Sequence, residues 1–229
     1  MADPMGSIPV YLEQGTKRVV AAALDWPGWC RIGRDEATAL QALADYAPRY
    51  APVAATAGLD FSAPEAVSSF TVSERLTGSA STDFGSPGAI PMADNQPVTA
   101  GELARLQALL TACWQTFDEA VRAAAGKELA KGPRGGGRDL AQIDAHVLEA
   151  EAAYLERATG TRFEPAGDGP AGREQGLRQA VLAGLAAAAH GEVAPVGPRG
   201  GKRWPPRYFA RRAAWHVLDH AWEIEDRSA

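Results

Sequence analysis

The second half of the chain consists largely of strong helix formers, and this restricts its fold more than any other feature. Ala, Leu, Glu and Arg predominate from residue 99 to residue 227, and all four have high helix propensity. Thr99 and Glu102 have the spacing of an N-terminal capping box. The residues that follow predict a helix with one buried face, because apolar side chains recur at steps of three and four: Leu103, Leu106, Leu110, Cys113, Phe117 and Val121.

Three further segments predict helices of similar length. Asp139 is a suitable N-cap for the first of them, the second spans about residues 171–189, and the third follows Pro206 and extends to about residue 226. Four helices of about 20 residues pack economically as a bundle. We therefore predict an all-α, up-down-up-down four-helix bundle over residues 98–229, in which the second and fourth helices run parallel.

Residues 8–97 predict a small α+β module that precedes the bundle. β-branched and apolar runs indicate strands at residues 8–12, 17–24, 30–33 and 70–76, and a helix begins after Asp35 and continues to about Arg49. Residues 78–96 are rich in turn-forming residues and predict a loop. The fold class is thus an α+β module followed by a helical bundle, with the boundary near residues 95–98.

Three of the four histidines fall into a geometric pattern. His216 and His220 are four residues apart on the last predicted helix, so their rings project from one face, about 6 Å apart. His146 lies on the same stripe of the second helix as Ile143 and Val147. His146 is roughly 10 Å into its helix and His216 roughly 15 Å into its own, at 1.5 Å per residue. In parallel helices the three imidazoles would meet at one level, which predicts a shared divalent cation.

Three neutral imidazoles leave coordination positions open for water or substrate, which is typical of a catalytic site. Zinc is the expected ion, with nickel and iron as alternatives. The other interpretation is that the His216/His220 pair is incidental and that His146 is only hydrogen-bonded. Burying three imidazoles without a shared partner would be costly, which favours the metal. Glu223, on the same side of the helix, is a candidate catalytic base or outer partner of a ligand, or else a solvated residue in a salt bridge.

Two similar basic loops precede the second and fourth helices, at residues 132–138 and 197–203. If these helices are parallel, both loops emerge at one end of the bundle. Helix N-termini and basic side chains there would bind an anionic small molecule. The candidate binding residues are Arg134, Arg138, Arg199, Lys202 and Arg203. Flexible basic linkers are the alternative interpretation.

The segment from Arg207 to Arg227, which contains the His216/His220 pair, resembles the last helix of the DinB-like superfamily. These proteins are four-helix bundles with a three-histidine metal site, one ligand on the second helix and an HxxxH pair on the fourth. The superfamily includes thiol-dependent S-transferases and a mycothiol-dependent maleylpyruvate isomerase, in which the metal is thought to activate the thiol. The resemblance covers about residues 99–227. It implies a metal-dependent transferase or isomerase that uses a low-molecular-weight thiol.

Residues 8–50 resemble the HicB-like antitoxin fold. The match includes the Asp25-Trp-Pro-Gly turn, the strand after it and the acidic start of the next helix. No DNA-binding element adjoins this segment, so the resemblance implies an accessory module for a protein partner. It also supports the alternative function, a non-enzymatic, metal-stabilised interaction module that works through its N-terminal domain.

Charge and hydropathy exclude several classes of partner. The net charge of −5 and the pI of about 5.4 argue against a nucleic-acid-binding face. Even the longest run of low polarity, residues 180–189, is too short for a transmembrane helix. The first residues lack the features of a signal peptide, so we expect a cytoplasmic protein. Two distant cysteines indicate no disulfide scaffold.

Overall fold

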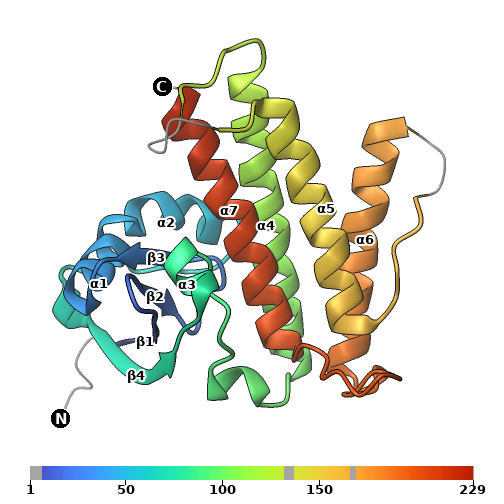
Figure 1. The fold of residues 1–229 in the computed structure, drawn as a ribbon, viewed down its shortest axis with the longest axis horizontal. Helices are drawn as coiled ribbons and strands as arrows, with labels where there is room; N and C mark the ends of the chain where they lie inside the picture. Colours follow the sequence, from blue (N-terminus) through green and yellow to red (C-terminus); the bar gives the residue numbers. More distant parts are fainter. Residues whose placement is uncertain (1–6, 132–136, 166–168, 229) are drawn as a thin grey trace. The chain divides into compact units, whose positions relative to one another are not determined.

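The chain forms two compact units, residues 1–96 and residues 97–229 (Figure 1). The computed structural model describes residues 7–131, 137–165 and 169–228. Each unit is described by itself below. None of the described helices is both long enough and apolar enough to cross a membrane.

Unit 1 is built on a mixed four-stranded sheet with the order β3-β2-β1-β4. Strands β1 (Ile8–Gln14), β2 (Val19–Ala23) and β3 (Cys30–Gly33) form an antiparallel meander. Strand β4 (Phe70–Thr77) pairs with β1 in parallel. The prediction that the N-terminal part contains both strands and helices is confirmed. All five residues of β2 are buried, as befits a central strand.

Two helices follow β3, where the sequence predicted one. Helix α1 (Glu36–Asp45) begins with a capping box between Asp35 and Thr38, and α2 (Ala47–Thr56) begins two residues after α1 ends. The break has a local cause. Pro48 lacks the N–H that a continuous helix needs, and its ring would collide with the carbonyl group four residues earlier. The prediction of a single helix through Arg49 was therefore wrong.

The core of unit 1 contains a cluster of aromatic rings around Trp29. Its side chain is fully buried, stacks on Tyr50 with ring centroids 5.8 Å apart, and donates a hydrogen bond from Nε1 to the Leu43 carbonyl oxygen at 2.9 Å. Phe61 and Phe70 pack against the same indole ring. The indole thus fills the core and satisfies its polar N–H as well.

A buried carboxylate orders residues 78–96, which the sequence predicted as a loop. Glu13 on β1 is 0% exposed, and its side chain accepts hydrogen bonds from the Thr82 hydroxyl, Gly88 N (2.8 Å) and Ala89 N (2.9 Å). A buried carboxylate requires such donors. The segment contains helix α3 (Ala80–Phe84) and a 3-10 turn at Met92–Asn95; another 3-10 turn, Val67–Ser69, precedes β4.

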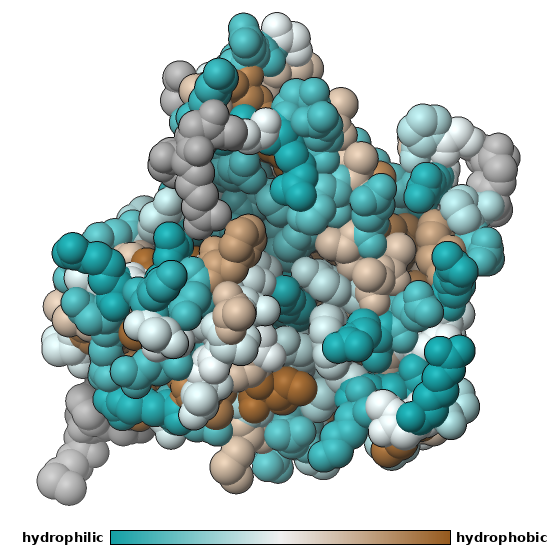
Figure 2. Space-filling model, viewed as in Figure 1, coloured by the Kyte–Doolittle hydropathy of each residue, from teal (hydrophilic) through white to brown (hydrophobic). Residues whose placement is uncertain are grey.

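Unit 2 consists of long helices that pack against one another (Figure 1). They are α4 (Ala100–Ala124), α5 (Leu140–Thr159), α6 (Gly169–Ala189) and α7 (Pro206–Ser228). Capping boxes at Thr99 and Asp139 begin α4 and α5. Residues of α7 are buried around most of the helix, including Phe209, Trp215 and Trp222. The visible outer faces of the helices are mostly hydrophilic (Figure 2).

The directions of these helices differ from the predicted up-down-up-down order. Arg207 at the start of α7 pairs with Glu102 at the start of α4, so these two helices are parallel. Arg227 at the end of α7 donates to the Arg138 carbonyl oxygen just before α5, so α5 and α7 are antiparallel. Helices α5 and α6 run the same way. The predicted parallel arrangement of the second and fourth helices is wrong, because α6 does not reverse the direction of α5 (Figure 1). Nine residues separate Thr159 from Gly169, and an extended chain of that length spans about 30 Å, the length of a 20-residue helix.

Candidate metal centre

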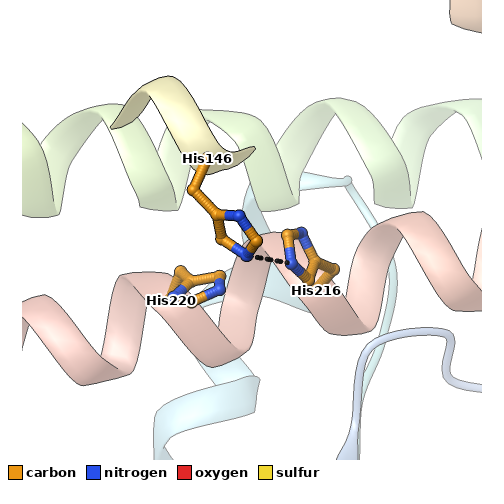
Figure 3. Close-up of side chains that lie close together, drawn as sticks. All are labelled: His146, His216 and His220. Atoms are coloured by element: carbon orange, nitrogen blue, oxygen red, sulfur yellow. Dashed lines mark hydrogen bonds between the residues drawn. The ribbon is translucent and has the colours of Figure 1, made fainter. Parts of the chain in front are cut away.

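Three histidine rings from two helices point toward one another in unit 2 (Figure 3). His146 projects from α5, and His216 and His220 project from adjacent turns of α7. One ring nitrogen from each residue lies within 4.8 Å of the other two. The Nε2 atoms of His146 and His216 are 3.3 Å apart. The structure therefore brings together the three residues that the sequence singled out.

The separation of the His146 and His216 nitrogens fits two ligands of one cation. Two Zn–N bonds of about 2.0–2.1 Å at a tetrahedral angle place their nitrogens about 3.3–3.4 Å apart. His220 completes a set of donors that would leave a fourth position open. The limit of 4.8 Å on the ring-nitrogen separations exceeds this tetrahedral separation by about 1.4 Å, so the third donor would move closer to the other two when an ion binds.

The surroundings of His146 and His216 favour their neutral forms, which are the forms that bind metals. His216 and His220 are 6% and 9% exposed. Desolvation lowers the pKa of His216 well below its usual value, and the neighbouring His220 and His146 lower it further. Desolvation also lowers the pKa of His146, with a contribution from Arg138. Metal binding would therefore displace few protons from these two rings near neutral pH.

His216 has a buried nitrogen that lacks a hydrogen-bond partner among the described residues. Its Nε2 atom faces His146, while Nδ1 is buried and unpaired. The rings of Tyr154 and Trp215 surround the imidazole, with centroids 5.6 and 5.8 Å from it. An unpaired buried ring nitrogen is costly, and coordination through Nε2 would leave Nδ1 without a partner.

Glu223 orients the third histidine. His220 Nδ1 donates a hydrogen bond to Glu223 Oε2 at 2.8 Å, which leaves the lone pair of the neutral ring on Nε2. This hydrogen bond also lowers the pKa of Glu223. Metal-bound histidines are commonly held by a carboxylate in this way. The geometry suits an outer partner of a ligand, and the catalytic role for Glu223 stays a prediction.

Arg227 holds Glu223 in place and was missed in the sequence. Its Nη1 atom donates to Glu223 Oε1 at 2.6 Å, and its other nitrogens donate to the carbonyl oxygens of Ala130 (2.7 Å) and Arg138 (2.8 Å). The side chain is 9% exposed. Its position four residues after Glu223, on the same helix face, was the signal that could have identified it.

The predicted basic rim does not form as expected. Because α5 and α7 are antiparallel, the connectors that precede them lie at opposite ends of unit 2. The Arg203 guanidinium lies against Gly160 at the end of α5, where a Cβ atom would be 2.1 Å from Nη2. Arg199 and Lys202 are exposed near that end. Arg138 is exposed beside the start of α5, and Arg134 lies outside the described residues. The prediction that both loops form a single basic rim is therefore wrong.

Neither Cys30 nor Cys113 forms a disulfide, and both are buried. Burial raises the pKa of the Cys113 thiol, and the charge of Glu151 raises it further. A thiol in this environment is a poor nucleophile. The prediction that Cys113 packs in the helical core is confirmed.

Comparison of the chain with protein-family models, with curated proteins and with solved structures found no match.

Proposed function

We propose that unit 2 binds a divalent cation through His146, His216 and His220. The 3.3 Å separation of the His146 and His216 Nε2 atoms carries the proposal, since both point at the space that His220 also borders. The Glu223 partner of His220 supports it, because metal-bound histidines are commonly held by a carboxylate. Zinc is the first candidate because all three donors are imidazoles, and nickel or iron would also accept them.

We further propose that the cation serves a metal-dependent transferase or isomerase that uses a low-molecular-weight thiol. Three protein ligands leave coordination positions open, and a bound cation lowers the pKa of a thiol or water that occupies one of them. The positive charges of Arg138 and Arg212 act on His216. They would also favour an anionic ligand in the open position. Glu223 keeps His220 oriented during this step.

The proposal also includes a specific fold type for each of the two units. We infer that the helices of unit 2 form a four-helix bundle of the DinB-like type, with one ligand on the second helix and an HxxxH pair on the fourth. The resemblance of residues 207–227 supports this inference. For unit 1 we propose a HicB-like accessory module that binds a protein partner, on the basis of residues 8–50.

Elemental analysis of the purified protein tests the metal site. We expect about one divalent ion per chain in the wild type and strong depletion in His146→Ala, His216→Ala and His220→Ala. His190→Ala is the matched control, because His190 lies outside the cluster and its side chain is 58% exposed. A wild-type protein without metal, or a His216→Ala variant that retains it, would contradict the proposal.

Assays of the metal-loaded protein then separate the enzymatic proposal from the alternative. Consumption of a low-molecular-weight thiol that depends on His216 would support a transferase or isomerase. Metal binding without turnover, together with a protein partner that requires residues 8–50, would instead identify a metal-stabilised interaction module.

A further inference from the structure

A cavity of about 400 Å³, lined by both polar and apolar groups, lies between α4 and α6, and none of the three clustered histidines lines it. Trp114 and Asp118 of α4 border it on one side, and Glu174 and Arg178 of α6 border it on the other. Leu182 adds an apolar surface. The cavity combines an aromatic ring, aliphatic surface and charged groups, as small-molecule sites commonly do.

The charged groups of this cavity are held in a fixed arrangement. Arg178 binds Asp118 through both terminal nitrogens, at 2.7 and 2.6 Å, and its Nη2 atom also pairs with Glu174 at 2.6 Å. The guanidinium carbon lies 5.5 Å from the centre of the Trp114 ring. One guanidinium thus serves two carboxylates that both line the cavity.

A third carboxyl group lies beyond Trp114. Glu151 of α5 is 1% exposed, and its Oε1 atom accepts a hydrogen bond from Trp114 Nε1. Its Oε2 atom is buried without a partner among the described residues. Asp144 of α5 is a fourth carboxyl group, and it interacts electrostatically with Arg178 and Asp118. These four carboxyl groups and Arg178 carry excess negative charge in a partly dehydrated region.

We propose that this cavity binds a small organic cation, a primary ammonium group on a short hydrocarbon chain. The ammonium group would donate hydrogen bonds to the remaining lone pairs of Asp118 and Glu174. The hydrocarbon would pack on Leu182 and beside Trp114, whose ring also attracts cations. The site is separate from the histidine cluster and does not depend on the proposed metal function.

The cavity is less suited to a hard metal ion. Calcium and magnesium require about six oxygen ligands in a tight shell, whereas Asp118 and Glu174 are already directed at Arg178. The volume of about 400 Å³ also far exceeds that of a single ion, while it accommodates a short diamine.

The protonation of the carboxyl groups at and near the cavity predicts how the binding of a cation depends on pH. Desolvation raises the pKa of Glu151 to about 7 and also raises the pKa of Glu174. A bound cation would favour the ionised carboxylates and thereby release protons. Binding should therefore strengthen as the pH rises from 6 to 8.

Isothermal titration calorimetry of the full chain with putrescine dihydrochloride tests the proposal. We expect saturable binding at one site, with an observed enthalpy that differs between phosphate and Tris buffers because protons are released. Glu174→Gln should weaken binding at least tenfold. Glu119→Gln is the matched control, because it removes the same charge from an exposed position of α4 that does not line the cavity.

A second variant avoids disruption of the Arg178 ion pairs. Gln115 is exposed and lines the cavity, so Gln115→Lys would place an ammonium group inside it and should abolish putrescine binding. Three results would overturn the proposal: no binding by the wild type, unchanged binding by Gln115→Lys, or heat from magnesium chloride but none from putrescine.

Discussion

Arg227 and Glu223 form an ion pair at 2.6 Å on consecutive turns of α7, and the same carboxylate holds His220. The two side chains thereby connect the third candidate ligand to the carbonyl oxygens of Ala130 and Arg138. Metal affinity should consequently depend on residues that do not touch the metal.

Glu223→Gln should reduce metal affinity about 10- to 100-fold, which is the usual effect of losing an outer partner of a ligand. The amide can still accept a hydrogen bond from His220, but it lacks the charge that strengthens the bond. Competition with a chromogenic chelator would measure the affinity. Glu225→Gln, at an exposed position of the same helix, should leave it unchanged. Equal affinities for the two variants would refute the role of Glu223.

Arg227→Met should lower both metal affinity and thermal stability. Methionine retains much of the buried hydrocarbon but removes the donors to Glu223, Ala130 and Arg138. Loss of hydrogen bonds from a charged group costs about 1.5–3 kcal/mol each at most. Thermal unfolding with and without added zinc would separate the two effects. A variant with normal stability in both conditions would show that these bonds contribute little.

Glu151 should make the protein less stable as the pH rises from about 5 to 7. Burial raises the folded-state pKa from 4.5 to about 7, so in this range the folded state keeps a proton that the unfolded state has lost. Stability is then highest below the unfolded pKa and falls by up to roughly 3 kcal/mol by pH 7. Urea unfolding of the wild type and Glu151→Gln across this range would test it. Parallel pH profiles for the two proteins would argue against a raised pKa.

Gly184→Ala should destabilise unit 2 because α5 and α6 approach closely at this position. A Cβ atom there would lie 2.7 Å from Leu155 Cδ1 and 2.9 Å from Thr159 Cγ2, and overpacking of this kind costs about 1–3 kcal/mol. Gly101→Ala is the control, since a Cβ atom at Gly101 meets nothing within 4 Å. That change should stabilise α4 by up to about 1 kcal/mol through helix propensity alone. The comparison requires only urea midpoints of the two variants.

Local signals in the sequence predicted the elements well. Thr99 begins α4 with the predicted capping box, and Asp139 is the N-cap of α5 as predicted, because capping involves residues within one turn. Pro48 carried an equally local signal for the end of α1, but the apolar pattern that continues past it concealed the break. The role of Glu13 was not predictable, because its donors lie 69 to 76 residues away.

The histidine cluster was predicted despite the wrong helix direction. His146 lies 6 residues after Leu140, while His220 lies 8 residues before Ser228 and His216 lies 10 residues after Pro206. Since the pair is near the middle of α7, its depth is similar from either end. The matching depths of the histidines along their helices therefore could not reveal the direction of either helix. The prediction of a shared basic rim depended on that direction, and it was wrong.

The buried carboxylate of Glu13 sets a minimum length for an independently folding version of unit 1. A fragment that stops after β4 would contain every strand of the sheet, yet it would lack Thr82, Gly88 and Ala89, the donors to that carboxylate. The negative charge would then remain inside without compensation, at a cost of several kcal/mol. Anyone dissecting the protein should accordingly place the cut beyond Ala89.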